Sequence, residues 1–195
     1  MLKHPQILLA TILFVLGLSA LPAVQAGSLS TSRTIAGHLL DSIDQATWVA
    51  EGKGKHIVYI FFDPDCPYCH KLYNELRPLV AERDLQLRWI PVGMLAATSL
   101  GKAAAILQAA DPLAALHTNE DNFNFSDGGP GGGIAPAATI SEQTRLNLAA
   151  NLSPLQEQNL FAVPVAVFRA RDGRGFMFQG APPDKTLSQL LQYVQ

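Results

Sequence analysis

Residues 56–69 read HIVYIFFDPDCPYC, and this stretch decides the fold. Its first seven residues are apolar and rich in β-branched and aromatic side chains, which predicts a buried strand over residues 56–62. An Asp-Pro pair ends that strand. A helix is expected to begin at Pro67, because proline suits the first helical turn, where its missing N–H is not needed. The pair Cys66 and Cys69 therefore stands where a buried strand passes into a helix.

The residues that follow repeat the alternation of strand and helix. Apolar side chains at helical spacing predict a helix over about residues 67–82, and Pro78 within it predicts a kink or an early end. Residues 85–92 alternate apolar and polar side chains, which predicts a second strand. A strand, a helix and a strand in this order favour a parallel pair joined by a crossover helix.

The C-terminal part of the chain has the pattern of a hairpin followed by a helix. Val163 and Pro164 lead into an apolar run, and Asp172 with Gly173 is typical of a hairpin turn. The expected elements are strands over residues 165–169 and 175–179 and a helix over residues 183–194.

Between these two parts, at about residues 96–159, we expect an inserted helical segment. Its expected helices cover residues 99–108, 111–117 and 141–159, the last with Ser141 as a cap and Pro154 as an interruption. A polar, glycine-rich run over residues 119–138, centred on residues 127–133, is expected to be a mobile loop and not an element of the fold. The order of elements therefore predicts an α/β protein with a thioredoxin fold and an inserted helical segment.

The N-terminus has the layout of a secretory signal peptide. Lys3 precedes an apolar run over residues 7–21, and the small residues Val24 and Ala26 suit cleavage after Ala26. An uncleaved membrane anchor is the competing interpretation, but the run is shorter than the ~20 residues that a spanning helix needs. We therefore expect a signal peptide over residues 1–26, a short leader over residues 27–55 and a thioredoxin-like catalytic domain over residues 56–195.

Composition restricts the class of protein. The chain has 195 residues, of which 48% are hydrophobic, so it can bury one sizeable core. Its formal net charge of -2 shows no basic excess, and we expect no nucleic acid partner. Both of its 2 cysteines lie in the CxxC, and a disulfide between such close neighbours closes too short a loop to stabilise much. In an exported chain the pair is better explained as a reactive dithiol than as a staple.

The expected chemistry follows from the place of the pair at a helix N-terminus. Free N–H groups and the helix dipole favour negative charge there, so the Cys66 thiol should ionise readily and attack disulfides. Cys69 lies one turn further in and is expected to be the more buried thiol, which closes the disulfide and releases a mixed intermediate. The carboxylates of Asp63 and Asp65 oppose a thiolate, unless Asp65 is the N-cap of the helix.

His70 and Lys71 are cations that could support the thiolate, although solvated positions on the helix face are the more frequent outcome. A copper site built from the two cysteines and His70 or His117 is an alternative, because thiolate and imidazole suit this metal. A structural zinc site needs four ligands, and the sequence has no second cysteine pair. We expect neither a metal nor another cofactor.

Five stretches carry a resemblance to a known family. They are FFDPDCPYCHKL at residues 61–72, IPVGML at 90–95, GKAAAILQAADPLAAL at 101–116, LFAVPVAVF at 160–168 and GAPPDKTLSQLL at 180–191. Together they resemble the catalytic domain of the periplasmic thiol:disulfide interchange proteins of the DsbC/DsbG type, and DsbG more closely. The resemblance implies reduction and isomerisation of wrong disulfides in the periplasm, and sulfenic acids as further substrates. It also implies exported proteins with cysteines as clients and a membrane reductase of the DsbD type as electron donor.

The same resemblance implies roles for particular residues. Pro164 is expected to have a cis peptide bond and to face the CxxC, and a trans proline that opens an edge strand is the alternative. Val163 beside it offers backbone groups with which an extended substrate can pair as an added strand. Pro67 and Tyr68, between the two cysteines, are expected to contact substrate as well.

Two features depart from the family. Its members carry an N-terminal dimerisation domain, for which residues 27–55 are too short, so we expect a monomer or a weak oligomer. Val163 stands where the family usually has threonine and the oxidase DsbA has valine. A disulfide-forming oxidase with the same site is therefore a second hypothesis. A copper-binding metallochaperone and a non-catalytic interaction protein with a static disulfide are further ones.

Overall fold

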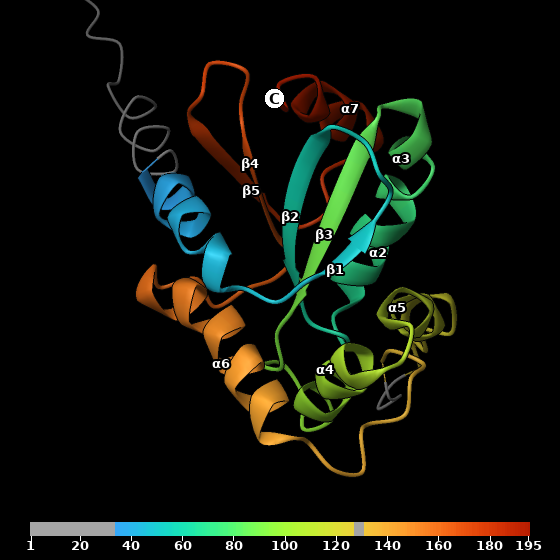
Figure 1. Ribbon diagram of the computed structural model, residues 1–195. Helices are drawn as coiled ribbons and strands as arrows, with labels where there is room; N and C mark the ends of the chain where they lie inside the picture. The colour runs from blue at the N-terminus through green and yellow to red at the C-terminus, as the bar shows by residue number, and fades with distance from the viewer. Residues whose placement is uncertain (1–33, 127–130) are drawn as a thin grey trace, which may run out of the picture.

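The computed structural model describes residues 34–126 and 131–195 (Figure 1). The expected signal peptide over residues 1–26 and the central part of the expected mobile loop, residues 127–130, lie outside the described residues. A five-stranded sheet forms the centre of the molecule, in the order β1-β3-β2-β4-β5. Its strands are β1 (Val49–Glu51), β2 (His56–Phe62), β3 (Leu85–Pro91), β4 (Val165–Arg169) and β5 (Gly175–Gln179).

The β2 strand is central because its residues are apolar on both faces. It pairs in parallel with β3 and antiparallel with β4, so that Ile60 lies beside Trp89 on one side and Ala166 on the other. Both faces of such a strand are covered, which explains a nearly continuous apolar run in place of an alternating one. The predicted strand over residues 56–62 and the predicted parallel pair are confirmed.

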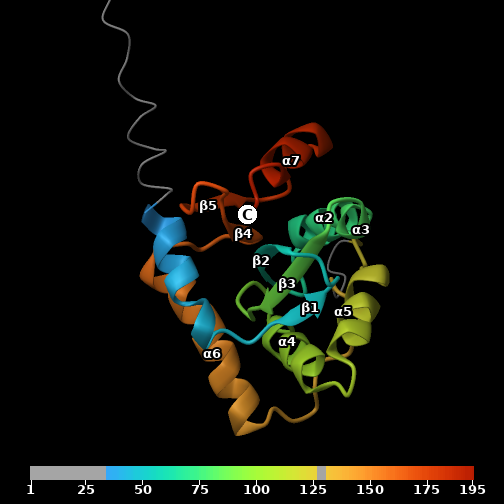
Figure 2. The same ribbon diagram turned by 45° about the horizontal axis from the view of Figure 1, so that its top comes forward.

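Helices cover both faces of the sheet. They are a helix over residues 34–41, α2 (Pro67–Leu76), α3 (Leu79–Glu82), α4 (Ser99–Gln108), α5 (Pro112–Asp121), α6 (Glu142–Glu157) and α7 (Asp184–Leu191), with a 3-10 turn at Ile43–Gln45. Figures 1 and 2 show α2, α3 and α7 on one side of the sheet and the helix over residues 34–41 with α6 on the other. Helices α4, α5 and α6 follow β3 and precede β4, which is the insertion that the sequence predicts. The thioredoxin fold with an inserted helical segment is confirmed.

Of the two prolines expected to break helices, Pro78 does so and Pro154 does not. Helix α2 ends at Leu76 and Pro78 caps the short α3, so the predicted break is confirmed. Pro154 was expected to interrupt the last helix of the insert, but α6 continues to Glu157. Pro154 and Leu155 are buried, and this tertiary packing offsets the hydrogen bond that proline cannot donate.

The glycine-rich run is part of the fold wherever the structure describes it. Helix α5 extends to Asp121, beyond the expected end at residue 117. Gly131 forms a β-bridge with Asn124, and the N–H of Gly133 donates to the carbonyl of Asn119 at 2.8 Å. The expectation of a mobile loop is therefore wrong for residues 131–133, because contacts with the insert hold them.

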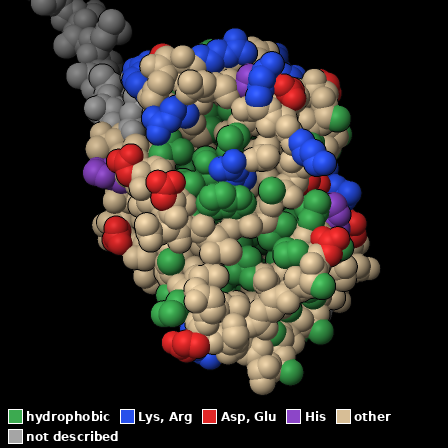
Figure 3. Space-filling view, in the orientation of Figure 1, with side chains coloured by type: hydrophobic (Ala, Val, Ile, Leu, Met, Phe, Trp, Pro, Cys, Tyr) green, Lys and Arg blue, Asp and Glu red, His purple; other side chains and the backbone are tan. Residues whose placement is uncertain are grey.

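The core lies where α2 packs on the sheet. The Trp89 ring contacts those of Phe62 and Tyr73, with centroids 5.7 Å and 5.8 Å apart, and its Nε1 donates to Glu51 at 3.0 Å. On the face shown in Figure 3, apolar side chains gather across the middle and charges of both signs surround them. Within residues 34–126 and 131–195, none of the helices combines the length and the apolar character that crossing a membrane requires.

Candidate functional site

Cys66 occupies the junction between β2 and α2 and is itself the N-cap of the helix. Its backbone is extended, and its sulfur accepts the N–H of Cys69 at 3.3 Å. Pro67 takes the first helical position, as the sequence predicts. The alternative in which Asp65 is the cap is wrong, because the Asp65 side chain points to the insert and is bonded there. A sulfur in this position receives the free N–H groups that a helix leaves at its start.

A second segment approaches the same sulfur from far along the chain. The Val163–Pro164 peptide bond is cis, as expected, and Pro164 directly precedes β4. The Cys66 thiol donates to the carbonyl of Val163 at 3.4 Å, across a sequence separation of 97 residues. Val163 is buried, and the group that it places beside the sulfur is its backbone carbonyl.

The two thiols are free, and their surroundings shift their pKa values in opposite directions. Hydrogen bonding from the Cys69 thiol lowers the pKa of Cys66, and the backbone N–H groups of Cys69 and Tyr68 lower it further against the effect of burial. Burial raises the pKa of Cys69, and the interaction with Cys66 raises it again. Cys66 is therefore the thiol that ionises first, and Cys69 stays protonated.

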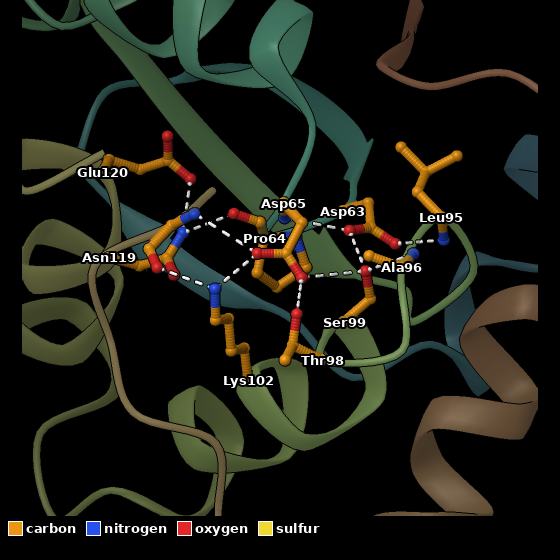
Figure 4. Close-up of polar contacts among 11 residues, drawn as sticks. Asp63, Pro64, Asp65, Leu95, Ala96, Thr98, Ser99, Lys102, Asn119 and Glu120 are labelled. Carbon is orange, nitrogen blue, oxygen red and sulfur yellow. Dashed lines mark hydrogen bonds and ion pairs between the residues drawn. The ribbon is translucent and has the colours of Figure 1, made fainter. Parts of the chain in front are cut away.

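Asp63 anchors the loop that leads from β2 to Cys66 (Figure 4). The residue is fully buried, and its carboxylate accepts the N–H groups of Met94 and Leu95 at 2.7 Å and 3.0 Å. Its other oxygen accepts the Ser99 hydroxyl at 2.6 Å and the N–H of Asp65 at 2.9 Å. Asp63 also raises the pKa of Cys66 slightly, as its sequence position suggested. Its main contribution is to tie the start of the insert to the CxxC loop.

Asp65 forms a buried ion pair with Lys102 of α4 (Figure 4). The Lys102 amine lies 2.5 Å from the Asp65 carboxylate and donates to the carbonyl of Gly132 at 2.8 Å. Thr98 donates its hydroxyl to the other carboxylate oxygen at 2.7 Å. The Lys102 and Asp65 side chains are only 2% and 4% exposed. The negative charge nearest Cys66 in sequence is thus neutralised inside the protein.

Lys102 was not anticipated as a site residue. It lies on the buried face of α4 together with Ala103 and Ile106. A lysine among apolar residues at that helical spacing is the signal that could have found it, since charged groups are buried only when paired.

His70 is held against the insert and is not solvated. Its Nδ1 lies 3.3 Å from the carboxylate of Glu120, whose side chain is 2% exposed, and its Nε2 contacts the Asn74 amide at 2.8 Å. Burial raises the pKa of Glu120, and the bond with His70 opposes that rise. The expectation of a solvated helix face is therefore wrong for His70, because α5 covers it. Lys71 does lie on the exposed face, where it pairs with Glu75.

The histidines of the copper hypothesis are engaged by carboxylates. His117 lies 3.1 Å from Glu51, and His70 faces Glu120. Over the part of the chain that the structure describes, no three His, Cys, Asp or Glu side chains gather in a way that could hold a metal ion.

Pro67 and Tyr68 lie on the surface beside the buried sulfur of Cys66. Tyr68 is 64% exposed, whereas Cys66 is 3% and Cys69 1% exposed. The structure thus brings together Cys66, Cys69, Val163 and Pro164, and it leaves Pro67 and Tyr68 at the rim.

Comparison with known proteins places this site in context. The model of the thioredoxin-like domain family matches residues 43–195. The chain is 33% identical over 159 residues to the thiol:disulfide interchange protein DsbG of Pseudomonas aeruginosa, covering 80% of this chain and 60% of that protein. It is 30% identical over 151 residues to DsbG of Escherichia coli K12, covering 76% of this chain and 58% of that protein. The chain therefore spans about 60% of the length of these relatives.

Solved structures share the fold. A linker-deletion variant of Proteus mirabilis ScsC superposes with a TM-score of 0.67 at 16% identity, over 87% of this chain and 84% of the other. The thiol-disulfide exchange protein α-DsbA2 from Wolbachia pipientis superposes with a TM-score of 0.63 at 15% identity, over 86% of this chain and 98% of the other. At these identities the likeness concerns the fold alone.

Proposed function

The chain belongs to the thioredoxin-like domain family, and on this premise we propose that it is a thiol–disulfide oxidoreductase that reduces or isomerises disulfides of exported proteins. The observation that carries the proposal is the setting of the Cys66 sulfur. It caps α2, accepts the N–H of Cys69 at 3.3 Å and faces the carbonyl of Val163. The similarity to two proteins named thiol:disulfide interchange protein supports the same activity.

The reaction follows from the unequal thiols. The Cys66 thiolate attacks one sulfur of a client disulfide, so that a mixed disulfide forms and the other client sulfur leaves as a thiolate. In reduction, Cys69 then loses its proton and attacks the Cys66 sulfur, which releases the client thiol and leaves Cys66 and Cys69 oxidised. In isomerisation, another client thiolate attacks the mixed disulfide and Cys66 returns as a thiolate.

Backbone pairing would hold the client in place. Val163 precedes the strand β4, and its carbonyl already lies beside Cys66, so an extended client segment can pair there as an added strand. Pro67 and Tyr68 form the exposed rim on the other side of the sulfur. These four residues, Val163, Pro164, Pro67 and Tyr68, are our proposed substrate contacts, and sulfenic acids on single cysteines are further proposed substrates.

The setting in the cell is part of the same proposal. The pattern of residues 1–26 supports export into an oxidising compartment, which we take to be the periplasm. Turnover as a reductase then requires a dithiol donor, for which a membrane reductase of the DsbD type is our candidate. We propose that residues 56–195 form the catalytic unit, with the insert at about residues 96–159 as part of it; β1 and the helix over residues 34–41, from the expected leader, pack on this unit.

One observation favours the opposite direction of electron flow. The lowered pKa of Cys66 stabilises the reduced form, and a stabilised reduced form makes the disulfide a stronger oxidant. Val163 also lacks a hydroxyl that could hydrogen-bond near the sulfur. A disulfide-forming oxidase with the same two cysteines is therefore the second candidate.

The redox state of the cysteines in living cells separates the two candidates. Acid quenching followed by a mass-tagging alkylator reports whether Cys66 and Cys69 are thiols or a disulfide. Largely reduced cysteines are expected for a reductase or isomerase, and largely oxidised cysteines would overturn that assignment in favour of an oxidase. Cys66→Ser should abolish disulfide exchange in either case, and Cys69→Ser should accumulate mixed disulfides with clients. Exchange that persists in Cys66→Ser would contradict both candidates.

A further inference from the structure

An exposed phenylalanine of the insert stands beside the CxxC. Phe125 is 62% exposed, yet its position is fixed by two other rings. The centroid of its ring lies 4.7 Å from that of Phe123 and 5.1 Å from that of His70. A large apolar side chain that is held in place but left open to solvent adds little to the core. Its free side is available to a ligand at a small cost in side-chain entropy.

The free side of Phe125 faces a hollow that begins next to Cys66. The hollow has a volume of about 500 Å³, and its walls include Pro67, Tyr68, His70 and Phe125. Phe125 and Pro67 also line a second, smaller hollow of about 210 Å³ that reaches Asp65. The ring of Phe125 therefore separates two depressions that both touch the residue directly after Cys66.

The charged groups at the rim of the larger hollow are paired. Lys71 and Glu75 at its rim lie 3.7 Å apart and form an ion pair. The Nε2 of His70 contacts the Asn74 amide, and its Nδ1 lies 3.3 Å from the Glu120 carboxylate. No unpaired charge of either sign remains at these positions to select a charged ligand. The chemistry of the hollow suits an uncharged apolar side chain, above all an aromatic one, which can stack on the rings.

We propose that the hollow bounded by Tyr68, His70 and Phe125 is a subsite for an apolar side chain of the client, close in sequence to the cysteine that reacts with Cys66. This inference rests on the proposed function. A client is the expected occupant because the hollow adjoins the reacting atom. Pro67 and Tyr68, which directly follow Cys66 in the chain, both line it. A client joined to Cys66 by a mixed disulfide has its neighbouring residues within one or two extended residues of the hollow, about 3.3 Å each. The insert would thereby contribute sequence preference to the reaction.

Symmetric peptide disulfides test the subsite in a single turnover. One reduced chain reacts with a dimer of a short cysteine peptide: Cys66 and Cys69 become a disulfide, the peptide disulfide is reduced, and two peptide thiols are released with the two thiol protons. We compare peptides that carry phenylalanine at a position one or two residues from the cysteine with peptides that carry serine there. The wild-type chain should react roughly fivefold to twentyfold faster with the best phenylalanine peptide, because its ring is buried in the hollow.

The ratio of the two rates is the informative quantity, because a general loss of activity cancels from it. Phe125→Ala should bring the ratio close to one. Tyr193→Ala is the matched control, because Tyr193 is a similarly exposed aromatic residue (64%). Its carbonyl accepts the N–H of Arg171, which follows the C-terminal end of β4, whereas Pro164 and Cys66 lie at the other end. This control should keep both the rates and the ratio. A ratio that Phe125→Ala leaves unchanged would overturn the subsite.

A measurement that leaves Tyr68, His70 and Phe125 in place guards against the case in which Phe125→Ala fails to fold. A peptide with a photoreactive phenylalanine analogue, joined to Cys66 of a Cys69→Ser chain, should crosslink to Tyr68, His70 or Phe125. Crosslinks confined to the neighbourhood of Phe161 and Val163 would overturn the proposal. Two results together would assign the hollow to a second copy of the chain instead. The ratio would fall as protein concentration rises, and the chain would form a dimer that Phe125→Ala dissociates. If no peptide reacts through Cys66, the proposed function itself fails, whatever the ratio.

Discussion

Cys66 and Cys69 are separated by two residues, but their thiols meet different surroundings. Cys66 caps α2 and is hydrogen-bonded by the Cys69 thiol and by backbone N–H groups, which lower its pKa. Cys69 is enclosed within the helix and the core, and burial raises its pKa. The division of roles between an attacking and a resolving thiol is thus set by single hydrogen bonds and by burial, residue by residue.

The Cys69 thiol is the largest cause of the lowered pKa of Cys66. We expect Cys69→Ala to raise the pKa of Cys66 toward the ordinary thiol value, although the N–H of residue 69 remains. Alkylation of Cys66 slows as pH falls through its pKa, because only the thiolate reacts. The midpoint of this profile should therefore lie at higher pH in Cys69→Ala than in the reduced wild-type chain. An unchanged midpoint would mean that the helix N-terminus alone stabilises the thiolate.

Lys102 is predicted to be a large single contributor to stability. Lys102→Met leaves the buried Asp65 carboxylate without its ion-pair partner, and breaking such a pair costs about 3–5 kcal/mol. Urea unfolding measures the loss, and the exposed Lys185→Met serves as the control, with an expected change within about 0.5 kcal/mol. Adding Asp65→Asn to Lys102→Met should recover part of the loss, because the uncompensated charge is gone. Equal, small losses for both lysines would contradict the ion pair.

At the scale of elements, the junction of β2 with α2 depends on local sequence pattern and on tertiary hydrogen bonds. The strand and the helix form from local pattern, because an apolar run and a proline at the first helical turn favour them. The loop between them is held from outside, by Ser99 and Lys102 of α4 and by the backbone of residues 131–133. The insert therefore holds the CxxC loop in place through hydrogen bonds and an ion pair to Asp63 and Asp65.

This support can be tested through the backbone of Gly132. A Cβ built at Gly132 would lie 2.0 Å from the Asn119 side chain and 2.4 Å from the carbonyl of Pro64, in the loop before Cys66. We expect Gly132→Ala to lower the free energy of unfolding by about 1–3 kcal/mol, since the segment must shift. Gly37→Ala is the control, because nothing lies within 4 Å of its Cβ and the residue is helical. It should be neutral or stabilise by roughly 0.5–1 kcal/mol. Equal effects of the two variants in urea unfolding would show that residues 131–133 do not support the fold.

At the scale of the whole molecule, the redox state of one pair of sulfurs is linked to the stability of the chain. In the reduced protein, the lowered pKa of Cys66 adds a stabilisation that is fully present above the ordinary thiol pKa. This stabilisation is lost as pH falls through the folded-state pKa of Cys66. The raised pKa of Cys69 acts the other way, and its contribution is lost only as pH rises above the ordinary thiol value. The oxidised protein has neither titration.

We therefore expect the stability of the reduced chain, relative to the oxidised chain, to increase as pH rises from below the folded-state pKa of Cys66 to the ordinary thiol pKa. The measurement is the difference between the free energies of unfolding of the two forms in urea across that range. Cys66→Ser is the control. It keeps a single thiol and cannot form the disulfide, so its own free energy of unfolding is compared with that of the oxidised wild-type chain, and this difference should show no such increase. A difference that decreases over this range would mean that Cys66 is not a stabilised thiolate in the folded protein.

The sequence by itself determined the elements whose causes are local. The apolar run of residues 56–62, the proline at residue 67 and the alanine-rich pattern of residues 99–108 each predicted the element that forms, and the CxxC was placed at its junction. These predictions succeed because side-chain spacing and backbone chemistry act over one or two turns. The cis bond at Pro164 was anticipated through family resemblance and not through a local pattern.

Only the tertiary structure decided which distant groups meet at the CxxC. The pairs Asp65–Lys102, His70–Glu120 and Cys66–Val163 join residues that are far apart in the chain. Local pattern left a cap at Asp65 open and favoured a solvated His70 and a mobile glycine run. The cap at Asp65 and the solvated His70 are wrong, and the mobile run is wrong for residues 131–133, where the insert packs against the site. The physical reason is that a buried charge or carbonyl takes the partner that the folded chain brings to it, and sequence spacing does not encode that partner.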